Sequence, residues 1–278
     1  MKGLCKLCGN NRPLQNSHII PRSFYKFIKS HSGQLVRVQE HKEFSHLSNS
    51  DPKEFLLCYE CEQFLSCEYE ISCNNILIDK QKILKSERYN DTFELKGYDY
   101  TTYYLFFISI LWRAAVSEKY GARGFACLNK FLINSVKNKT IFTMQGDRLD
   151  NHVKLLLIKL KDTNEQISQT SLQEIIVDLR IEEPIAEDSD DDATVIYMVL
   201  QGFVIAYIIH DPKHPFNHIR FRKRVGILQQ SGTTLIPTVD FRELRSIFKA
   251  INLIHQRPLK TRAHRIKNKI THNFKSKE

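Results

Sequence analysis

The sequence lacks an apolar run long enough to cross a membrane. Its two longest apolar stretches are residues 103–112, which Arg113 ends, and residues 195–209, which Gln201 and Gly202 interrupt. A membrane-spanning helix needs about 20 consecutive apolar residues. The first residues also lack the apolar segment of a secretory signal. We therefore expect a soluble cytoplasmic protein that has no membrane partner.

Internal repeats are absent as well, and the composition is otherwise ordinary. Of the 278 residues, 42% are apolar and 26% are charged, which is typical of a globular protein. This length is sufficient for one large domain or two smaller ones, each with a buried core. The seven cysteines are not expected to form disulfides in a reducing compartment, so they favour metal binding.

Acidic residues are scarce near one end of the chain. Residues 219–278 contain 15 Lys or Arg and three Asp or Glu, a net charge of +12, whereas residues 1–218 contain 26 and 28, a net charge of −2. The basic stretches 220–224 and 257–278 favour a polyanionic partner such as a nucleic acid. A charged surface that only keeps the protein soluble is the alternative. Aromatic residues are few in this segment, which does not favour a platform for stacking single strands.

Apolar residues at helical spacing predict helices in two regions. In residues 103–137 they predict two core helices with a break near Gly121 and Gly124. Asp240 is predicted to begin a further helix toward the C-terminus. Three cysteines are expected at core positions of helices: Cys67, Cys73 and Cys127.

Strands are predicted mainly in the second half of the chain. Residues 193–210 are typical of a buried β-hairpin that turns at Gly202. Residues 175–181 are rich in residues that favour strands, and residues 224–228 are a candidate strand. Between them, residues 182–192 contain seven acidic residues and are predicted to form a solvated loop.

Two C-x-x-C pairs stand far apart in the N-terminal part, Cys5 with Cys8 and Cys58 with Cys61. The first pair is followed by Gly9, as is common in turns that point two thiolates at one ion. Two such pairs supply the four sulfur ligands of a closed tetrahedral zinc site. The 49 residues between the pairs exceed the spacing of a compact zinc ribbon, so folded structure must fill the gap. The alternatives are a redox pair and buried cysteines without a ligand.

The segment between the pairs carries a motif, Asn-Ser-His-Ile-Ile-Pro at residues 16–21, and Leu-Cys-Tyr-Glu-Cys follows at residues 57–61. In this order the sequence resembles the zinc-stapled form of the HNH, or ββα-metal, endonucleases. More closely, residues 1–120 resemble uncharacterised bacterial proteins with a Ser-His-Ile-Ile-Pro motif, which we associate with mobile or antiphage-defence loci. The nuclease motif itself covers about residues 5–75.

The resemblance implies roles for individual residues. His18 stands where the family places the general base that deprotonates water, and a structural histidine is the alternative. Glu62 is the candidate ligand for one catalytic Mg²⁺ or Mn²⁺, which would stabilise charge on the phosphate. Such an enzyme would hydrolyse phosphodiester bonds of DNA.

The chain departs from the family on the metal side. Ser17 stands where the family has an acidic residue or His, and Ser66 stands where a further His is expected. The Asn that the family has before the second cysteine pair has no evident counterpart in this sequence. Residues that could complete the site are Asn49, Glu54, Glu70, Asn74, His31, His41 and His46. Glu62, Ser66 and Glu70 share one helix face by spacing, and a solvated polar face is the alternative.

We therefore predict an α+β protein with three parts. Residues 1–85 form a small zinc-stapled module that resembles the ββα-metal fold. Residues 86–256 form a mixed domain of helices and antiparallel strands, and residues 257–278 form a basic tail. The predicted function is that of a metal-dependent HNH-like endonuclease acting on DNA. The alternative is a non-catalytic zinc-binding module that binds nucleic acid, or a protein partner, in a multi-component defence system.

Overall fold

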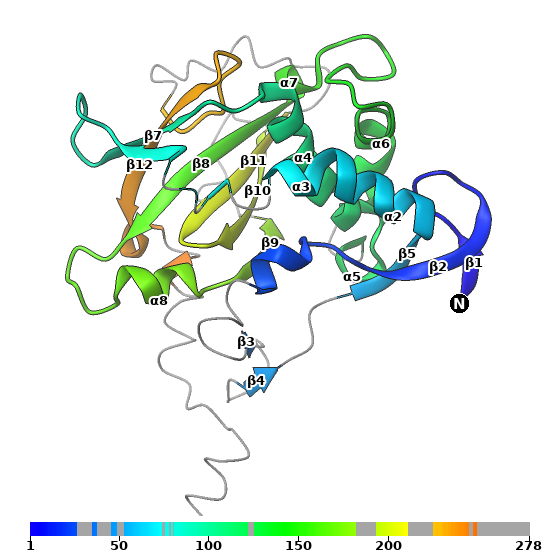
Figure 1. The fold of residues 1–278 in the computed structure, drawn as a ribbon, viewed down its shortest axis with the longest axis horizontal. Coiled ribbons are helices and arrows are strands. Elements are labelled where there is room, and N and C mark those ends of the chain that lie inside the picture. The colour runs from blue at the N-terminus through cyan, green and yellow to red at the C-terminus, as the bar shows by residue number, and fades with distance from the viewer. Residues whose placement is uncertain are drawn as a thin grey trace, which may run out of the picture.

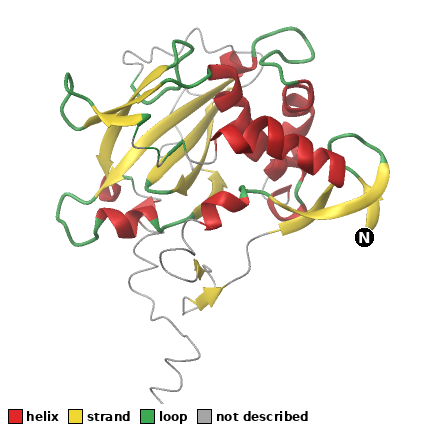
Figure 2. Ribbon diagram, viewed as in Figure 1, coloured by secondary structure: helices red, strands yellow, loops and turns green. Residues whose placement is uncertain are grey.

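The fold is a mixture of α-helices and β-strands, as predicted (Figure 2). The structure is a computed structural model, and it describes residues 1–26, 35–37, 46–48, 53–73, 76–77, 79, 81–121, 125–181, 193–210, 225–244 and 247–248. The predictions for residues 182–192, 220–224 and 257–278, and for His31, His41, Asn49, Asn74 and Gly124, fall outside these ranges.

Residues 1–73, which we call the N-terminal region, contain a small antiparallel sheet followed by a helix (Figure 1). Its strands are β1 (Lys2–Leu4), β2 (Asn11–His18) and β5 (Lys53–Cys58), in the order β1-β2-β5. The helix follows β5 without a loop, as α2 (Tyr59–Leu65), a π-helix (Ser66–Glu70) and α3 (Ile71–Cys73). A separate two-stranded sheet consists of β3 (Leu35–Arg37) and β4 (His46–Ser48).

Seven further strands form a second sheet, which we call the main sheet. In spatial order they are β6 (Ile83–Lys85), β7 (Thr92–Lys96), β12 (Thr233–Asp240), β8 (Val153–Lys161), β11 (Phe203–His210), β10 (Ala193–Leu200) and β9 (Val177–Ile181). Neighbouring strands are antiparallel except β12 and β8, which run parallel. The predicted hairpin is confirmed, since β10 and β11 pair from Leu200 with Phe203 outward and turn at Gln201 and Gly202.

Four strands of the main sheet were not predicted, namely β6, β7, β8 and β12, and one predicted strand was placed wrongly. The predicted strand at residues 224–228 is reduced to an isolated bridge between Ile227 and Leu156. The strand lies instead in β12, which contains Pro237, a residue that sequence reasoning assigns away from central strands. Asp240 begins a 3-10 helix of three residues, Phe241–Glu243, where its side chain accepts a hydrogen bond from the Arg242 amide, but Leu244 after it is extended, so the longer predicted helix does not run on unbroken from Asp240.

Helix α4 (Tyr100–Val116) packs across one face of the main sheet (Figure 1). It is buried around nearly its whole circumference, with Asp99 as N-cap. The Tyr104 hydroxyl donates to the carbonyl of Val153 in β8 at 2.8 Å, and the Tyr207 hydroxyl of β11 donates to that of Phe107 at 2.8 Å. Despite its apolar character, neither α4 nor any other helix in the described ranges has the length and hydropathy of a membrane span.

The second predicted core helix is α6 (Asn129–Asn138), so the two-helix prediction for this part of the chain is confirmed. The break between them holds α5 (Glu118–Gly121) and a 3-10 helix (Phe125–Leu128). Two short helices flank the main sheet, α7 (Leu149–His152) and α8 (Gln169–Gln173). One continuous core joins buried residues of the N-terminal region to those of α4 and the main sheet.

The helical cysteines were predicted correctly in one case of three. Cys73 is buried, but Cys67 and Cys127 are exposed. Cys67 lies within the π-helix, where Tyr69 takes the buried position. Cys127 lies in a 3-10 helix, whose tighter turn changes the face that each residue occupies, and Phe125 is the buried residue there.

Candidate metal centre and catalytic cluster

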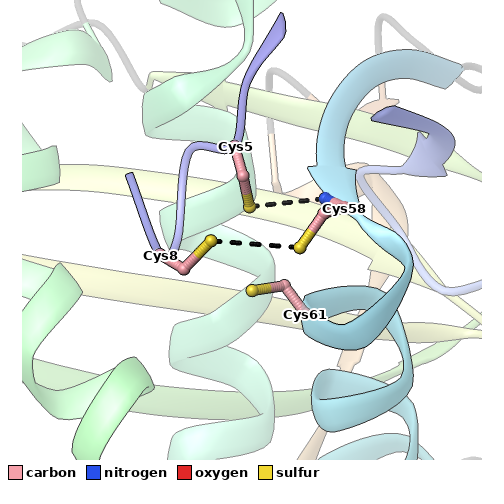
Figure 3. A group of neighbouring side chains, drawn as sticks. All are labelled: Cys5, Cys8, Cys58 and Cys61. Carbon is pink, nitrogen blue, oxygen red and sulfur yellow. Dashed lines mark hydrogen bonds between the residues drawn. The ribbon is translucent and has the colours of Figure 1, made fainter. Parts of the chain in front are cut away.

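The two cysteine pairs come together in the N-terminal region (Figure 3). The Sγ atoms of all four residues lie within 4.8 Å of one another, although 49 residues separate the pairs. Cys5 and Cys8 come from the turn between β1 and β2, whereas Cys58 ends β5 and Cys61 lies in the first turn of α2. Pairing of β2 with β5 therefore brings the two halves of the cluster side by side.

The turn between β1 and β2 shapes the first pair. The Gly9 amide donates to the Cys5 carbonyl at 2.9 Å, and the Cys5 amide donates to the Asn10 carbonyl at 2.9 Å. Gly9 has a φ of +76°, in the left-handed region that glycine adopts without strain. The closed turn directs the sulfurs of Cys5 and Cys8 toward the second pair (Figure 3).

The second pair sits where β5 becomes α2. Cys58 is the N-cap of α2, and its backbone amide donates to the sulfur of Cys5 at 3.3 Å. The sulfurs of Cys8 and Cys58 are 3.9 Å apart. The unpaired amides at the start of a helix carry partial positive charge, which favours a thiolate, but burial outweighs this and raises the pKa of Cys58.

Burial and hydrogen bonding act differently on these thiols. Burial raises the pKa of Cys5, but the backbone hydrogen bonds of Cys8, Cys58 and Leu7 outweigh it and lower the pKa to about 7. Burial, together with the sulfurs of Cys58 and Cys5, raises the pKa of Cys61. Four thiolates at this spacing repel one another unless a cation lies between them.

The donor set and the spacing fit a tetrahedral metal ion such as zinc. Zinc–sulfur bonds of about 2.3 Å place tetrahedral sulfurs about 3.8 Å apart, close to the 3.9 Å between Cys8 and Cys58. Within the part of the chain that the structure describes, no other group of three or more His, Cys, Asp or Glu converges in this way. The four cysteines can therefore hold a metal ion.

A second polar cluster adjoins the cysteines. Glu62 follows Cys61 directly in α2, and its Oε2 accepts a hydrogen bond from the Ser17 hydroxyl at 2.6 Å. Ser17 is 1% exposed, so its hydroxyl needs a partner inside the protein. The structure thus places the Glu62 carboxylate against Ser17, the residue before His18 in the motif at residues 16–21.

His18 ends β2, directly after Ser17. Its ring centroid lies 6.1 Å from that of Tyr25, with the planes 29° apart. The structure therefore brings the Glu62 carboxylate to Ser17, the direct neighbour of His18 in β2.

Two other acidic candidates have partners of their own. Glu54 accepts three hydrogen bonds of 2.5–3.2 Å from donors at the start of α5, so it caps that helix. Glu70 pairs with Arg113, with 2.6 Å between Oε1 and Nη2. The predicted polar stripe of Glu62, Ser66 and Glu70 is thus divided, since its first and last members contact different segments.

Arg113 is the residue of this cluster that sequence reasoning missed. Its side chain is 1% exposed, and its Nη1 donates to the backbone carbonyl of His18 at 3.4 Å. In the sequence it is visible only as the end of an apolar run. A charged residue on a helix that is otherwise buried requires a buried partner, and that signal could have found it.

Comparisons with known proteins add no family assignment to this geometry. No protein-family model, no curated protein and no solved structure matches the chain. We therefore interpret the cysteine cluster, and the group of Ser17, His18, Glu62, Glu70 and Arg113, from their own chemistry.

Proposed function

We propose that Cys5, Cys8, Cys58 and Cys61 hold a structural zinc ion. Four sulfur ligands fill a tetrahedral shell and leave no position for substrate, which is typical of structural sites. Elemental analysis of the purified protein should find about one zinc per chain, and less in Cys61→Ser. The control is Cys67→Ser, which removes an exposed thiol from the same helical segment. Folded wild-type protein without metal would overturn the assignment.

We further propose that the N-terminal region is an HNH-like endonuclease that hydrolyses phosphodiester bonds of DNA. The observation that carries this proposal is the unit of β2, β5 and α2, two antiparallel strands followed directly by a helix. This unit places the Glu62 carboxylate 2.6 Å from Ser17, next to His18 in the motif at residues 16–21. The cysteine cluster joins the same strands and helix, which supports a zinc-stapled version of the unit.

Each residue of the unit has a role in this proposal. His18 takes the proton from the attacking water as general base. Glu62, with the Ser17 oxygen beside it, provides oxygen ligands of the kind that Mg²⁺ and Mn²⁺ prefer. Such an ion supplies stabilisation of charge on the phosphate and the leaving oxygen.

Nicking of supercoiled plasmid DNA in Mg²⁺ or Mn²⁺ tests the proposal. His18→Ala should lower the rate by about 100-fold or more, since general-base catalysis contributes about 10²–10⁴-fold, and Glu62→Gln should weaken activation by the ion. The controls are Asn16→Ala, an exposed position in the same strand, and Glu60→Gln, an exposed position in the same helix. If the wild type cuts no DNA, or His18→Ala cuts equally well, the nuclease proposal fails.

The DNA would be recruited by the basic C-terminal segment. Residues 257–278 contain eight Lys or Arg and one Glu, and each phosphate they neutralise would release counterions. Deleting them should weaken DNA binding and reduce the slope of log affinity against log salt by about 0.9 for each phosphate that is no longer neutralised. Unchanged binding and slope would mean that this segment only promotes solubility.

A second candidate function is that of a non-catalytic zinc-binding module in the cytoplasm, which binds nucleic acid or a protein partner within an antiviral-defence system. The observation that favours it is the small number of metal ligands near His18 among the residues that the structure describes. Ser17 replaces the family's usual ligand, and the Glu54 and Glu70 carboxylates have other partners. DNA binding by the wild type without cutting, in both Mg²⁺ and Mn²⁺, would support this function over the nuclease.

A further inference from the structure

Arg113 is a buried cation in a helix whose neighbouring positions are apolar. Its side chain is 1% exposed, and Leu111, Trp112 and Ala114 beside it are each 0% exposed. Burying a guanidinium is costly, and a well-packed apolar side chain often serves such a position equally well or better. Stability alone therefore does not account for an arginine at this point of α4.

The guanidinium joins three segments that are far apart in the sequence. From α4, Nη2 pairs with Glu70 Oε1 at 2.6 Å, and Nη1 donates to the carbonyl of His18 at 3.4 Å. Glu70 is the last residue of the π-helix, a type of segment that often occurs at functional sites. Among the described residues, the Nε of Arg113 has no hydrogen-bond partner. Its described hydrogen bonds are thus directed at Glu70 and at the end of β2.

We propose that Arg113, oriented by Glu70, is a positioning residue for His18, an inference that rests on the proposed nuclease function. Pairing of β2 with β5 fixes the backbone before His18, and Arg113 fixes the carbonyl after it. Ile19 and Ile20, 1% and 0% exposed, anchor the residues that follow. The imidazole therefore leaves the strand in one direction, which matters because a misplacement of about 1 Å can cost about 100-fold in rate.

Removal of both charges tests this role without leaving an unpaired buried charge. The double variant Arg113→Met with Glu70→Gln should reduce kcat for DNA cleavage by about 10- to 100-fold, with KM, zinc content and melting temperature nearly unchanged. Arg113→Lys keeps the charge and should recover part of kcat. The matched control is Lys139→Met with Glu68→Gln, which removes another ion pair of the same π-helix, 3.0 Å long and more exposed.

A second readout is independent of activity. In protein with ¹³C-labelled histidine carbonyls, the His18 resonance, assigned by His18→Gln, should shift in the Arg113→Met double variant and not in the Lys139→Met control. An unmoved resonance together with unchanged kcat would overturn the positioning role. If the wild type cuts no DNA, the nuclease proposal fails, and the resonance alone decides whether Arg113 holds the end of β2.

Discussion

The sheet of β1, β2 and β5 in the N-terminal region has three short strands, whereas the main sheet has seven strands with α4 packed across one face. In the N-terminal region, links between distant segments include the cysteine cluster, the Ser17–Glu62 hydrogen bond and the Arg113 contacts. In the main sheet, apolar side chains of β8, β10 and β11 are buried in long paired strands. The candidate site thus lies in the region where such polar links join distant segments, and α4 connects this region to the main sheet.

Of the changes that distinguish the two regions, removal of the metal should have the largest effect, and it should act on the N-terminal region. Structural zinc sites bind with about 10–16 kcal/mol in zinc-finger peptides, so a bound ion would contribute strongly to holding β1, β2 and β5 together. In Cys61→Ser, or after chelation, backbone amides of β1, β2 and β5 should lose protection from hydrogen exchange, while those of β8 and β11 keep it. Cys67→Ser is the control. Equal loss in both sheets would show that the regions unfold as one unit.

A cavity introduced into the main sheet should lower the stability of that sheet and leave the cysteine cluster unaffected. Leu157 in β8 is 0% exposed, and Leu157→Ala should lower the free energy of unfolding by about 2–5 kcal/mol, with the zinc content unchanged. Urea titrations can follow this through Trp112, the single tryptophan. Leu84→Ala, at a position 45% exposed in β6, should change stability by less than about 0.5 kcal/mol. A loss of zinc in Leu157→Ala would contradict the separation of the two regions.

The same contrast explains what could be predicted from the sequence. The cysteine pairs are local motifs whose spacing indicates metal binding. The hairpin of β10 and β11 is visible in the sequence as two apolar runs on either side of a turn. In each case a few neighbouring residues contain the information. The first core helix was predictable for the same reason, since its apolar residues recur without interruption until Arg113.

The parts that could not be predicted depend on contacts between distant residues. Arg113 meets His18 across 95 positions, and Glu54 caps a helix that begins more than 60 positions later. β12 is placed by its pairing with β7 and β8, which compensates for Pro237 in a way that local propensity does not reveal. Cys127 was placed wrongly because its segment forms a 3-10 helix.

Two glycines offer a smaller and sharper comparison. Gly226 in the main-sheet region has φ +87°, and an added Cβ would lie 2.5 Å from Leu156 Cδ1 and 3.0 Å from the Leu157 carbonyl. Gly9 has φ +76° with nothing within 4 Å of such a Cβ. Gly226→Ala should therefore cost about 2–4 kcal/mol, backbone strain plus overpacking, and Gly9→Ala about 1 kcal/mol. Urea denaturation measures both, and similar values would mean that the neighbours of Gly226 yield readily.

The smallest expected effect concerns Asp240, a polar anchor of the main sheet. Its carboxylate accepts hydrogen bonds from the amides of Thr163 at 2.7 Å and Arg242 at 2.9 Å. Burial raises the pKa of Asp240, but these bonds and the Arg242 guanidinium outweigh it and lower the pKa to about 2. A carboxyl with a lowered pKa adds stability that is fully present above its unfolded pKa of about 3.9 and is lost as the pH falls through its folded value.

Asp240→Asn should therefore lower the free energy of unfolding by about 1–2 kcal/mol at pH 7, and the difference from the wild type should shrink between about pH 4 and pH 2. Acid also protonates the cysteine ligands, but this affects both proteins alike, so the difference between them isolates Asp240. Glu243→Gln, an exposed position three residues later, is the matched control. A constant difference across this pH range would show that the hydrogen bonds of the side chain, rather than its charge, stabilise the end of β12. The stability of the main sheet would then depend even less on charge than its contrast with the N-terminal region implies.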